Sequence, residues 1–377
     1  MLKFEIEKRE GLARVGVIKT PHGEIKTPAF VGAATRGTVK ALTFKEMNEL
    51  KSQAVLANTY HLFLAPGSEL IREGGGFAEF TGWKKPTFTD SGGFQIFSLP
   101  NVKITEEGAE FRSHIDGKKF LMTPELSMRT QWEIGADIHM AFDQLAKSNS
   151  RRDMKRAMER THRWLERCVE ENEKLKEEYK KKKLPEQYLY AVVQGGDFLD
   201  LRRESAEFEA KQKVDGFGIG GVFVADGMKE MLETVAPVLP EEKPRHLLGM
   251  GSEPVDLFVG AEGGCDTFDC VGPTRIARNG AVYTLDGRMN IKNARFTHDF
   301  SPIMEGCECE CCKNYTRAYL HHLFKVDEIT GKVLASIHNE HFVVEVVDKI
   351  RDSLLSGDFP EYKKTFLKRY YKNGGRA

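Results

Sequence analysis

The chain has 377 residues, too many for one small core, and its 40% hydrophobic and 30% charged side chains are typical of globular proteins. Its 56 basic and 56 acidic residues give a formal net charge of zero, so any nucleic-acid partner would have to bind a local basic patch. No apolar run is long enough to cross a bilayer, and we expect a cytoplasmic protein without a membrane partner.

The first part of the chain predicts β-hairpins followed by a repeated strand–helix unit. Residues 3–30 alternate apolar and polar side chains and turn at "EG" and "PHG". Eight short apolar runs follow, each ending in a glycine-rich or polar loop, and such runs are typical of strands buried on both faces. They occupy residues 29–33, 54–61, 87–93, 138–144, 188–196, 217–221, 246–251 and 267–275.

Eight such units predict an α/β fold, a (β/α)8 TIM-type barrel with N-terminal β-hairpins. A doubly wound sheet is the alternative, but no strand is followed by a glycine-rich dinucleotide fingerprint. The longest helix is expected over residues 150–183, where Ser150 can cap the start and Asp153 follows three residues later. We expect residues 1–300 to form the barrel. Residues 301–377, in which four cysteines crowd between positions 307 and 312, are expected to form a zinc-binding helical segment packed on it.

In such a barrel, reactive side chains lie where strands end and loops begin. Aspartates in loops are often helix caps or turn formers, so one alone would carry little weight. Three at equivalent places on three strands indicate a site. The residues at these positions are Asn58, Asp90, Ser91, Asp143, Gln194, Gly220, Gly221 and Asp269.

Four of the seven cysteines fall between residues 307 and 312, which predicts a metal site rather than a disulfide framework. Cys307, Cys309 and Cys312 have C-x-C-x-x-C spacing, and a structural zinc needs four sulfur or nitrogen ligands. Cys311 is a poor fourth ligand because it is adjacent to Cys312. A distant histidine is preferable, and the candidates are His321, His322, His338 and His341, with His338 expected at the start of the next element.

Several motifs together resemble one family, the bacterial tRNA-guanine transglycosylases, or queuine tRNA-ribosyltransferases. They are "TFTDSGGFQ", "MAFDQ", "VVQGG", "GIGGVFV", "FDCVGPTRIARNG" and "CECECCKNYTRAYLHHL", in order along the chain. The resemblance implies a zinc-containing barrel enzyme, a pentosyltransferase of queuosine biosynthesis. Such enzymes act on tRNA and replace guanine at the wobble position of GUN anticodons with a 7-deazaguanine base.

The resemblance also implies roles for single residues. Asp269 matches the nucleophile that forms a covalent link to ribose, and Asp90 matches the general acid/base. One structural Zn²⁺ would be bound by Cys307, Cys309, Cys312 and His338, leaving Cys311 unused. Base-binding residues would be Ser91, Phe94, Asp143, Gln194, Gly220 and Gly221, with an apolar contact near Leu248, and Arg275 and Arg278 would hold neighbouring anticodon bases.

Three positions bear on the incoming base. Val224 favours a small base, 7-aminomethyl-7-deazaguanine, because bulk there should exclude the larger side arm of queuine. Leu145 and Asp226 depart from the bacterial pattern, so direct insertion of queuine is an alternative. Tyr315, Tyr319 and His322 recur at helical spacing on a segment that forms a homodimer in the family.

Two other functions compete with this interpretation. A metal-dependent barrel hydrolase would need histidine and aspartate ligands at the strand ends, where histidine is scarce. A tRNA-binding subunit without chemistry should lack the nucleophile or the acid, whereas Asp90 and Asp269 are both present.

Overall fold

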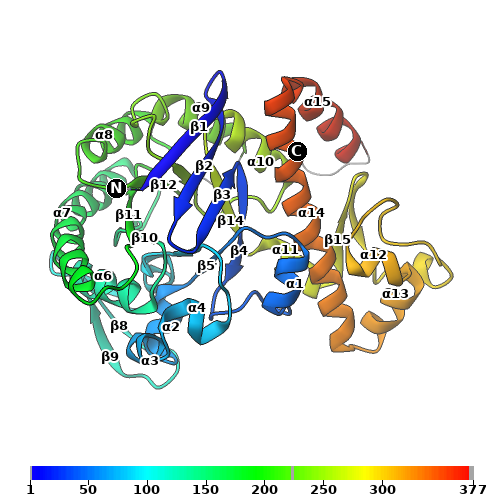
Figure 1. The fold of residues 1–377 in the computed structure, drawn as a ribbon, viewed down its shortest axis with the longest axis horizontal. Helices are drawn as coiled ribbons and strands as arrows, with labels where there is room; N and C mark the ends of the chain where they lie inside the picture. Colours follow the sequence, from blue (N-terminus) through cyan, green and yellow to red (C-terminus); the bar gives the residue numbers. More distant parts are fainter. Residues whose placement is uncertain (1, 222–224, 373–377) are drawn as a thin grey trace.

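Eight parallel strands close into a barrel, as the apolar runs predict, and the fold class is confirmed (Figure 1). The computed structural model describes residues 2–221 and 225–372, except for the side chains of residues 225 and 226. The order around the barrel is β10-β11-β12-β13-β14-β4-β5-β6. The barrel strands are β4 (Ala29–Ala34), β5 (Ala54–Ala57), β6 (Thr87–Thr89), β10 (Ile138–Met140), β11 (Tyr188–Val193), β12 (Gly216–Ile219), β13 (Arg245–Leu247) and β14 (Thr267–Cys270).

Helices surround the barrel, and their ends follow local capping chemistry. The longest begins after Ser150, whose side chain accepts a hydrogen bond from the backbone N–H of Asp153 at 3.2 Å, as predicted. Before residue 280 the helices are α1 (Phe44–Glu49), α2 (Thr59–Leu64), α3 (Ser68–Glu73), α4 (Gly76–Thr81), α5 (Gly93–Phe97), α6 (Pro124–Ile134), α7 (Arg151–Lys181), α8 (Leu199–Glu209), α9 (Ala225–Val235), α10 (Pro254–Glu262) and α11 (Gly272–Arg278).

An antiparallel sheet closes the amino end of the barrel. It consists of β1 (Lys3–Glu10), β2 (Ala13–Thr20) and β3 (Gly23–Thr27), the predicted hairpins. Its contacts reach aspartates that directly precede barrel strands. These contacts are Leu2 N to Asp215 at 3.0 Å, His22 Nδ1 to Asp137 at 2.9 Å, and Arg14 Nε to Asp266 at 2.9 Å. The sheet therefore covers the amino end, and the cavity described below lies at the opposite, carboxyl end.

The C-terminal part of the chain packs along one side of the barrel. The long helix α14 (Ile329–Ser356) contacts β4 and α11 and separates the barrel from α12 and α13 (Figure 1). The other elements here are β15 (Ala281–Thr284), β16 (Gly287–Asn290), the 3₁₀ helix Ala294–Phe296, α12 (Glu310–Asn314), α13 (Arg317–Lys325) and α15 (Phe359–Tyr370). A small sheet, β7 (Lys103–Ile104), β8 (Ala109–Arg112) and β9 (Lys119–Met122), lies between α5 and α6.

Two local expectations were wrong in this region. Tyr315 does not lie on one helix with Tyr319, because Thr316 caps α13 and Tyr315 is in an extended conformation before it. The two rings nevertheless stack, with centroids 5.5 Å apart. His338 does not open an element but lies near the middle of α14.

Arg14 should anchor the N-terminal sheet. Its guanidinium pairs with Asp266, and the two side chains are 3% and 0% exposed. Arg14→Met would leave a buried carboxylate without its partner, and we expect it to lower the free energy of unfolding by about 3–5 kcal/mol. Urea unfolding followed by tryptophan fluorescence measures this. Lys19→Ala, which breaks the exposed Lys19–Glu5 pair on the same strand, should leave the midpoint nearly unchanged. Equal midpoints for the two variants would contradict the anchor.

Candidate active site and metal centre

A cavity of about 320 Å³ opens at the carboxyl end of the barrel. It brings together most of the residues that the sequence singled out, from six different strand ends and the first turns of α5 and α11. Arg278 does not line it. The predicted residues that do are Asp90, Ser91, Phe94, Asp143, Gln194, Gly220, Gly221, Leu248, Asp269 and Arg275.

Asp90 follows β6 and receives hydrogen bonds from several donors. The backbone N–H groups of Thr59 and Gly92 donate to Oδ1 at 3.0 and 3.1 Å, and the Asn58 amide donates to Oδ2. Asn58 itself is fixed because its side-chain oxygen Oδ1 caps α2 by accepting from the backbone N–H of His61. Burial outweighs these hydrogen bonds and raises the pKa of Asp90 to about 7, and the charge of Asp269 acts in the same direction. At neutral pH, Asp90 can both donate and accept a proton.

Asp143 forms a second polar cluster in the cavity. Its Oδ1 accepts from the Ser91 hydroxyl at 2.7 Å, and its Oδ2 accepts from Gln194 Nε2 at 2.6 Å. Burial raises the pKa of Asp143, while these two hydrogen bonds oppose the shift. Each oxygen keeps a second lone pair, so the carboxylate can still accept two parallel hydrogen bonds from a ligand.

The turn after β12 brings backbone close to the cavity. Gly221 has φ +73°, and a side chain there would approach the guanidinium of Arg202. Arg202 is fully buried on α8 and donates to the carbonyls of Val193 and Gly196 at 2.8 Å each. It therefore fixes the loop that presents Gln194.

Asp269 lies on β14, and its two oxygens have different surroundings. Oδ1 accepts from the backbone N–H of Gly249 at 2.8 Å and lies 3.1 Å from His246 Nε2. Among the residues that the structure describes, no donor contacts Oδ2. One oxygen is thus held in place while the other is free to react.

Apolar surfaces face each other across the cavity. Phe94 on α5 is 58% exposed, unusually high for a phenylalanine. On the other side, Leu248 packs against Gly218 and Gly220, where a β-carbon would lie only 3.1 and 3.3 Å from its side chain. A flat aromatic ligand between Phe94 and Leu248 would cover both.

Four cations gather beside the cavity. Arg275 and Arg278 lie on α11, and Arg36 and Lys40 lie in the loop after β4. Burial lowers the pKa of Lys40, as do the charges of Arg278, Arg36 and Arg275. None of the four has an ion-pair partner within the described parts of the chain. A concentration of unpaired positive charge favours an anionic ligand.

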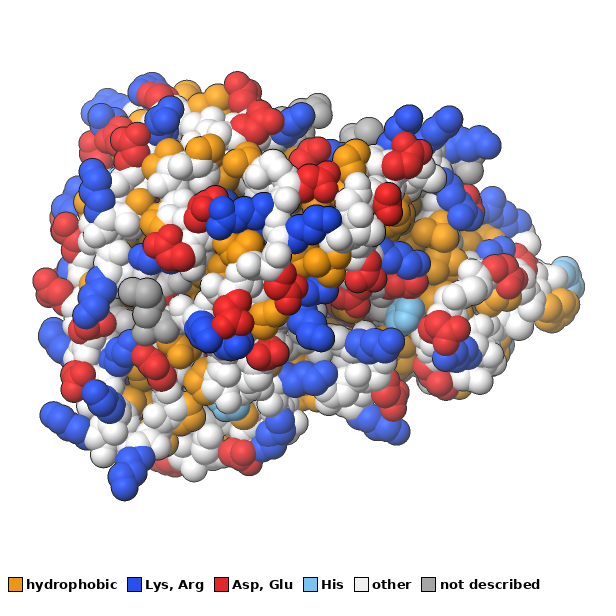
Figure 2. All heavy atoms as spheres, turned by 45° about the horizontal axis from the view of Figure 1, so that its top comes forward, with side chains coloured by type: hydrophobic (Ala, Val, Ile, Leu, Met, Phe, Trp, Pro, Cys, Tyr) orange, Lys and Arg blue, Asp and Glu red, His pale blue; other side chains and the backbone are white. Residues whose placement is uncertain are grey.

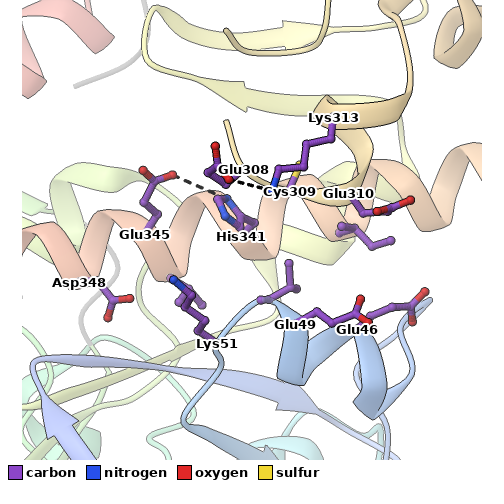
Figure 3. A pocket seen from close by; sticks show the side chains of 13 residues that line it. Glu46, Glu49, Lys51, Glu308, Cys309, Glu310, Lys313, His341, Glu345 and Asp348 are labelled. Carbon is purple, nitrogen blue, oxygen red and sulfur yellow. Dashed lines mark ion pairs between the residues drawn. The ribbon is translucent and has the colours of Figure 1, made fainter. Parts of the chain in front are cut away.

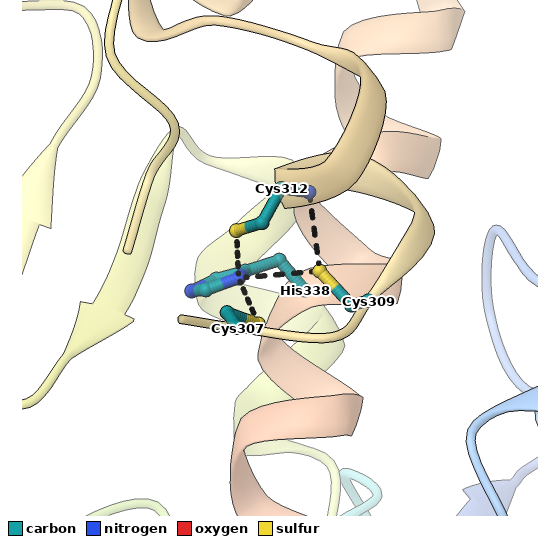
Figure 4. A group of neighbouring side chains, drawn as sticks. All are labelled: Cys307, Cys309, Cys312 and His338. Atoms are coloured by element: carbon teal, nitrogen blue, oxygen red, sulfur yellow. Dashed lines mark hydrogen bonds between the residues drawn. The ribbon is translucent and has the colours of Figure 1, made fainter. Parts of the chain in front are cut away.

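The cysteine segment and α14 form a group that can hold a metal ion (Figure 4). The Sγ atoms of Cys307, Cys309 and Cys312 lie 3.8, 3.6 and 3.3 Å from His338 Nδ1. His338 Nε2 donates to the carbonyl of Tyr283 at 2.7 Å, so the lone pair is on Nδ1, facing the sulfurs. Three sulfurs and one imidazole form a donor set compatible with zinc.

Two comparisons with known proteins decide the family. Residues 9–372 match the family model described as Queuine tRNA-ribosyltransferase. Relatives with that name occur in Symbiobacterium thermophilum (46% identity; 98% of this chain, 92% of the relative), Desulforamulus reducens (46%; 97% and 98%) and Bacillus subtilis (43%; 100% and 97%).

The chain belongs to the queuine tRNA-ribosyltransferase family. This confirms the family and the transferase class that the motifs predicted. No helix in residues 2–221 or 225–372 has the length and apolarity of a membrane span.

A second cleft, of about 410 Å³, lies between α1, the cysteine segment and α14 (Figure 3). His341 and Glu345 face it from α14, and Lys51 borders it below (Figure 3). Six carboxylates line this cleft, so it disfavours phosphate. They are Glu46, Glu49, Glu308, Glu310, Glu345 and Asp348. On the face shown in Figure 2, acidic and basic side chains are interspersed.

The sequence did not single out several residues that shape the candidate active site. Arg202, His246, Gly249, Arg36 and Lys40 carry no motif signal of their own. A buried histidine on a strand is usually a packed core residue. Cations in a surface loop are usually solvated. Only strand register and the path of the loops bring these residues close to the cavity.

We expect metal binding to depend on the four clustered residues and not on Cys311. Cys311 is fully buried outside the cluster, and burial raises the pKa of its thiol, so it remains a packed, protonated side chain. Cys309→Ser should lose bound zinc and thermal stability, since structural zinc contributes to folding. The matched Cys311→Ser should keep one zinc per chain by mass spectrometry of the metal. Loss of zinc from Cys311→Ser would contradict this ligand set.

Proposed function

We propose that this enzyme replaces guanine at the wobble position of tRNAs with GUN anticodons by a 7-deazaguanine, in queuosine biosynthesis. The observation that carries the proposal is one cavity lined by two reactive carboxyl groups, Asp90 and Asp269, and by the hydrogen-bonding edge that Asp143 forms. The relatives are named queuine tRNA-ribosyltransferase, which agrees with such a reaction.

A guanine bound in the cavity would match the polar edge. Asp143 can accept hydrogen bonds from N1–H and the exocyclic amine, using the lone pairs left by Ser91 and Gln194. The second N–H of Gln194 and the backbone N–H of Gly221 can donate to O6. Phe94 and Leu248 would cover the two faces of the base. The base must first leave the anticodon stack to reach this pocket.

Two displacements account for exchange with retained configuration. Oδ2 of Asp269 attacks C1′ of the ribose, the bond from C1′ to guanine breaks, and Asp90 gives its proton to the departing base. The incoming base then gives a proton to Asp90 and attacks C1′, and the bond to Asp269 breaks. The free Oδ2 supports Asp269 as the nucleophile, whereas Asp90, with a pKa of about 7, suits proton transfer.

We infer 7-aminomethyl-7-deazaguanine as the incoming base, with direct queuine insertion as the alternative. Leu145 lines the cavity, and its departure from the bacterial pattern is the ground for the queuine alternative. Val224, on which the size argument first rested, lies outside the described residues, and so does the side chain of Asp226.

The four cations on α11 and in the loop after β4 support an anticodon-loop partner, because phosphate contacts dominate affinity for nucleic acids. Arg275 and Arg278 can in addition bond to base edges. Arg36 and Lys40 extend the set that the sequence predicted.

We further propose that the segment 301–377 binds one structural zinc and takes part in a homodimer. It would then form a unit distinct from the catalytic barrel of residues 1–300. Its helix α14 contacts β4 and α11 of the barrel on one side and α12 and α13 on the other. Large apolar side chains are exposed in or next to this segment, which favours a protein interface. They are Phe300, Tyr319, Val326 and Ile329.

Incorporation of labelled guanine into unmodified tRNA with a GUN anticodon tests the proposed reaction. Asp269→Asn should abolish it, because an amide oxygen is a poor nucleophile. Separate reactions with 7-aminomethyl-7-deazaguanine and queuine then identify the incoming base. Absence of exchange by folded, zinc-loaded wild-type protein would contradict the proposal.

The pH dependence of guanine release should report on Asp90. The proton donor must be protonated, so the single-turnover rate should be level below about pH 7 and fall about tenfold per pH unit above it. Asp90→Asn should lower the rate about 10²- to 10⁴-fold and remove this limb. A wild-type rate independent of pH between 6 and 9 would exclude Asp90 as the acid.

Salt dependence should reveal the phosphate contacts. Lys40→Ala should raise KM for tRNA and reduce the slope of log affinity against log salt by about one unit per lost contact. Lys349→Ala removes a cation that is paired with Glu345 beside the acidic cleft, and it should leave both quantities unchanged. Equal effects of the two substitutions would contradict the RNA surface.

A further inference from the structure

His246 is a buried histidine that touches the proposed nucleophile. It lies on β13, is completely inaccessible to solvent, and its ring stacks on Phe88 with centroids 5.1 Å apart. Nε2 is 3.1 Å from Asp269 Oδ1, and Nδ1 is 2.8 Å from Thr267 Oγ1. Both ring nitrogens are therefore satisfied, in a chain that runs from Thr267 through the imidazole to Asp269.

The strand register builds this chain. His246 pairs with Thr267 between the parallel strands β13 and β14. Thr267 and Asp269 are two residues apart on β14, so their side chains point to the same face. Two neighbouring strands thus place hydroxyl, imidazole and carboxylate in line, and the stacked Phe88 keeps the ring from turning.

Proton positions follow from the chemistry of the three groups. An ionised carboxylate only accepts hydrogen bonds, so Nε2 must carry a proton toward Asp269. The Thr267 hydroxyl can then donate to Nδ1, which fixes the ring in the Nε2–H tautomer. With the N–H of Gly249, Oδ1 receives two hydrogen bonds.

We propose that His246, oriented by Thr267, is a positioning residue that makes Asp269 a better leaving group in the second displacement. This inference rests on the proposed function. When Oδ2 is bonded to C1′, Oδ1 is an ester carbonyl with little charge. When the incoming base displaces Asp269, the bonding electrons return to the carboxylate and negative charge grows on Oδ1. The two donors stabilise that charge as it forms.

The same donors also direct the first displacement. They hold the carboxylate so that Oδ2, which has no donor among the described residues, faces the cavity. They stabilise the ionised Asp269 before attack, so they do not speed formation of the covalent link. Removing the His246 donor should consequently slow breakdown of the intermediate more than its formation.

The test combines steady-state exchange with the amount of covalent protein–RNA species after denaturation. His246→Met keeps the volume but removes the donor. We expect kcat for guanine exchange to fall about 10- to 100-fold, the loss typical of a hydrogen bond to a charged group, with KM for tRNA within about twofold. The fraction of enzyme linked to RNA at steady state should rise above that of wild type.

Three further variants separate this role from a packing effect. His246→Gln carries an amide N–H where Nε2 lies and should restore most of the activity. Thr267→Val, which cannot fix the tautomer, should show a weaker form of the His246→Met phenotype. His139→Met removes an equally buried histidine on β10 that packs against Trp132, and it should leave the linked fraction unchanged.

The outcomes are distinct. If wild type exchanges guanine but His246→Met leaves kcat and the linked fraction unchanged, this inference is wrong and the proposed function stands. A loss that Gln does not restore, with no rise in linked RNA, also overturns it in favour of packing. If wild type exchanges no guanine, the proposed function itself fails. Should His246→Met not fold, the linked fractions of His246→Gln and Thr267→Val decide.

Discussion

Burial of three carboxyl groups at one end of the barrel is the constraint on which the site depends. An ionised carboxylate is costly to remove from water unless donors replace the lost solvation. Each aspartate meets that requirement differently. Asp90 is buried enough to retain a proton near neutral pH, Asp143 binds two side-chain donors, and Asp269 has donors on one oxygen only. Residues of one type thereby become a candidate acid, a hydrogen-bond acceptor and a candidate nucleophile.

Aspartates at the other, amino end of the barrel have a structural role. Asp137, Asp215 and Asp266 directly precede barrel strands. Asp137 contacts His22, Asp215 accepts from the backbone N–H of Leu2, and Asp266 pairs with the guanidinium of Arg14. Each carboxylate oxygen of these three aspartates accepts a hydrogen bond from the described part of the chain. Closing one end in this way makes the other end the accessible one, which agrees with how parallel barrels place their active sites.

Features set by local chemistry could be predicted from the sequence. The eight strands are short apolar runs, α7 begins at its capping serine, and the spacing of Cys307, Cys309 and Cys312 indicates one metal site. Spacing alone could not choose the fourth ligand among four histidines, because His338 reaches the cysteines from the middle of a distant helix. The resemblance to the family selected it, and the geometry of the cluster agrees. The contact between His246 and Asp269 could not be predicted, because it depends on the register between β13 and β14.

Identification of the residue that bonds to the RNA tests the central claim most directly. Wild-type enzyme and unmodified tRNA would be denatured during exchange, digested with protease and nuclease, and the ribose-bearing peptide sequenced by mass spectrometry. The account predicts the nucleotide on the peptide that contains Asp269, through its carboxylate. A nucleotide on the peptide that contains Asp90, or no covalent species while guanine exchange proceeds, would contradict it.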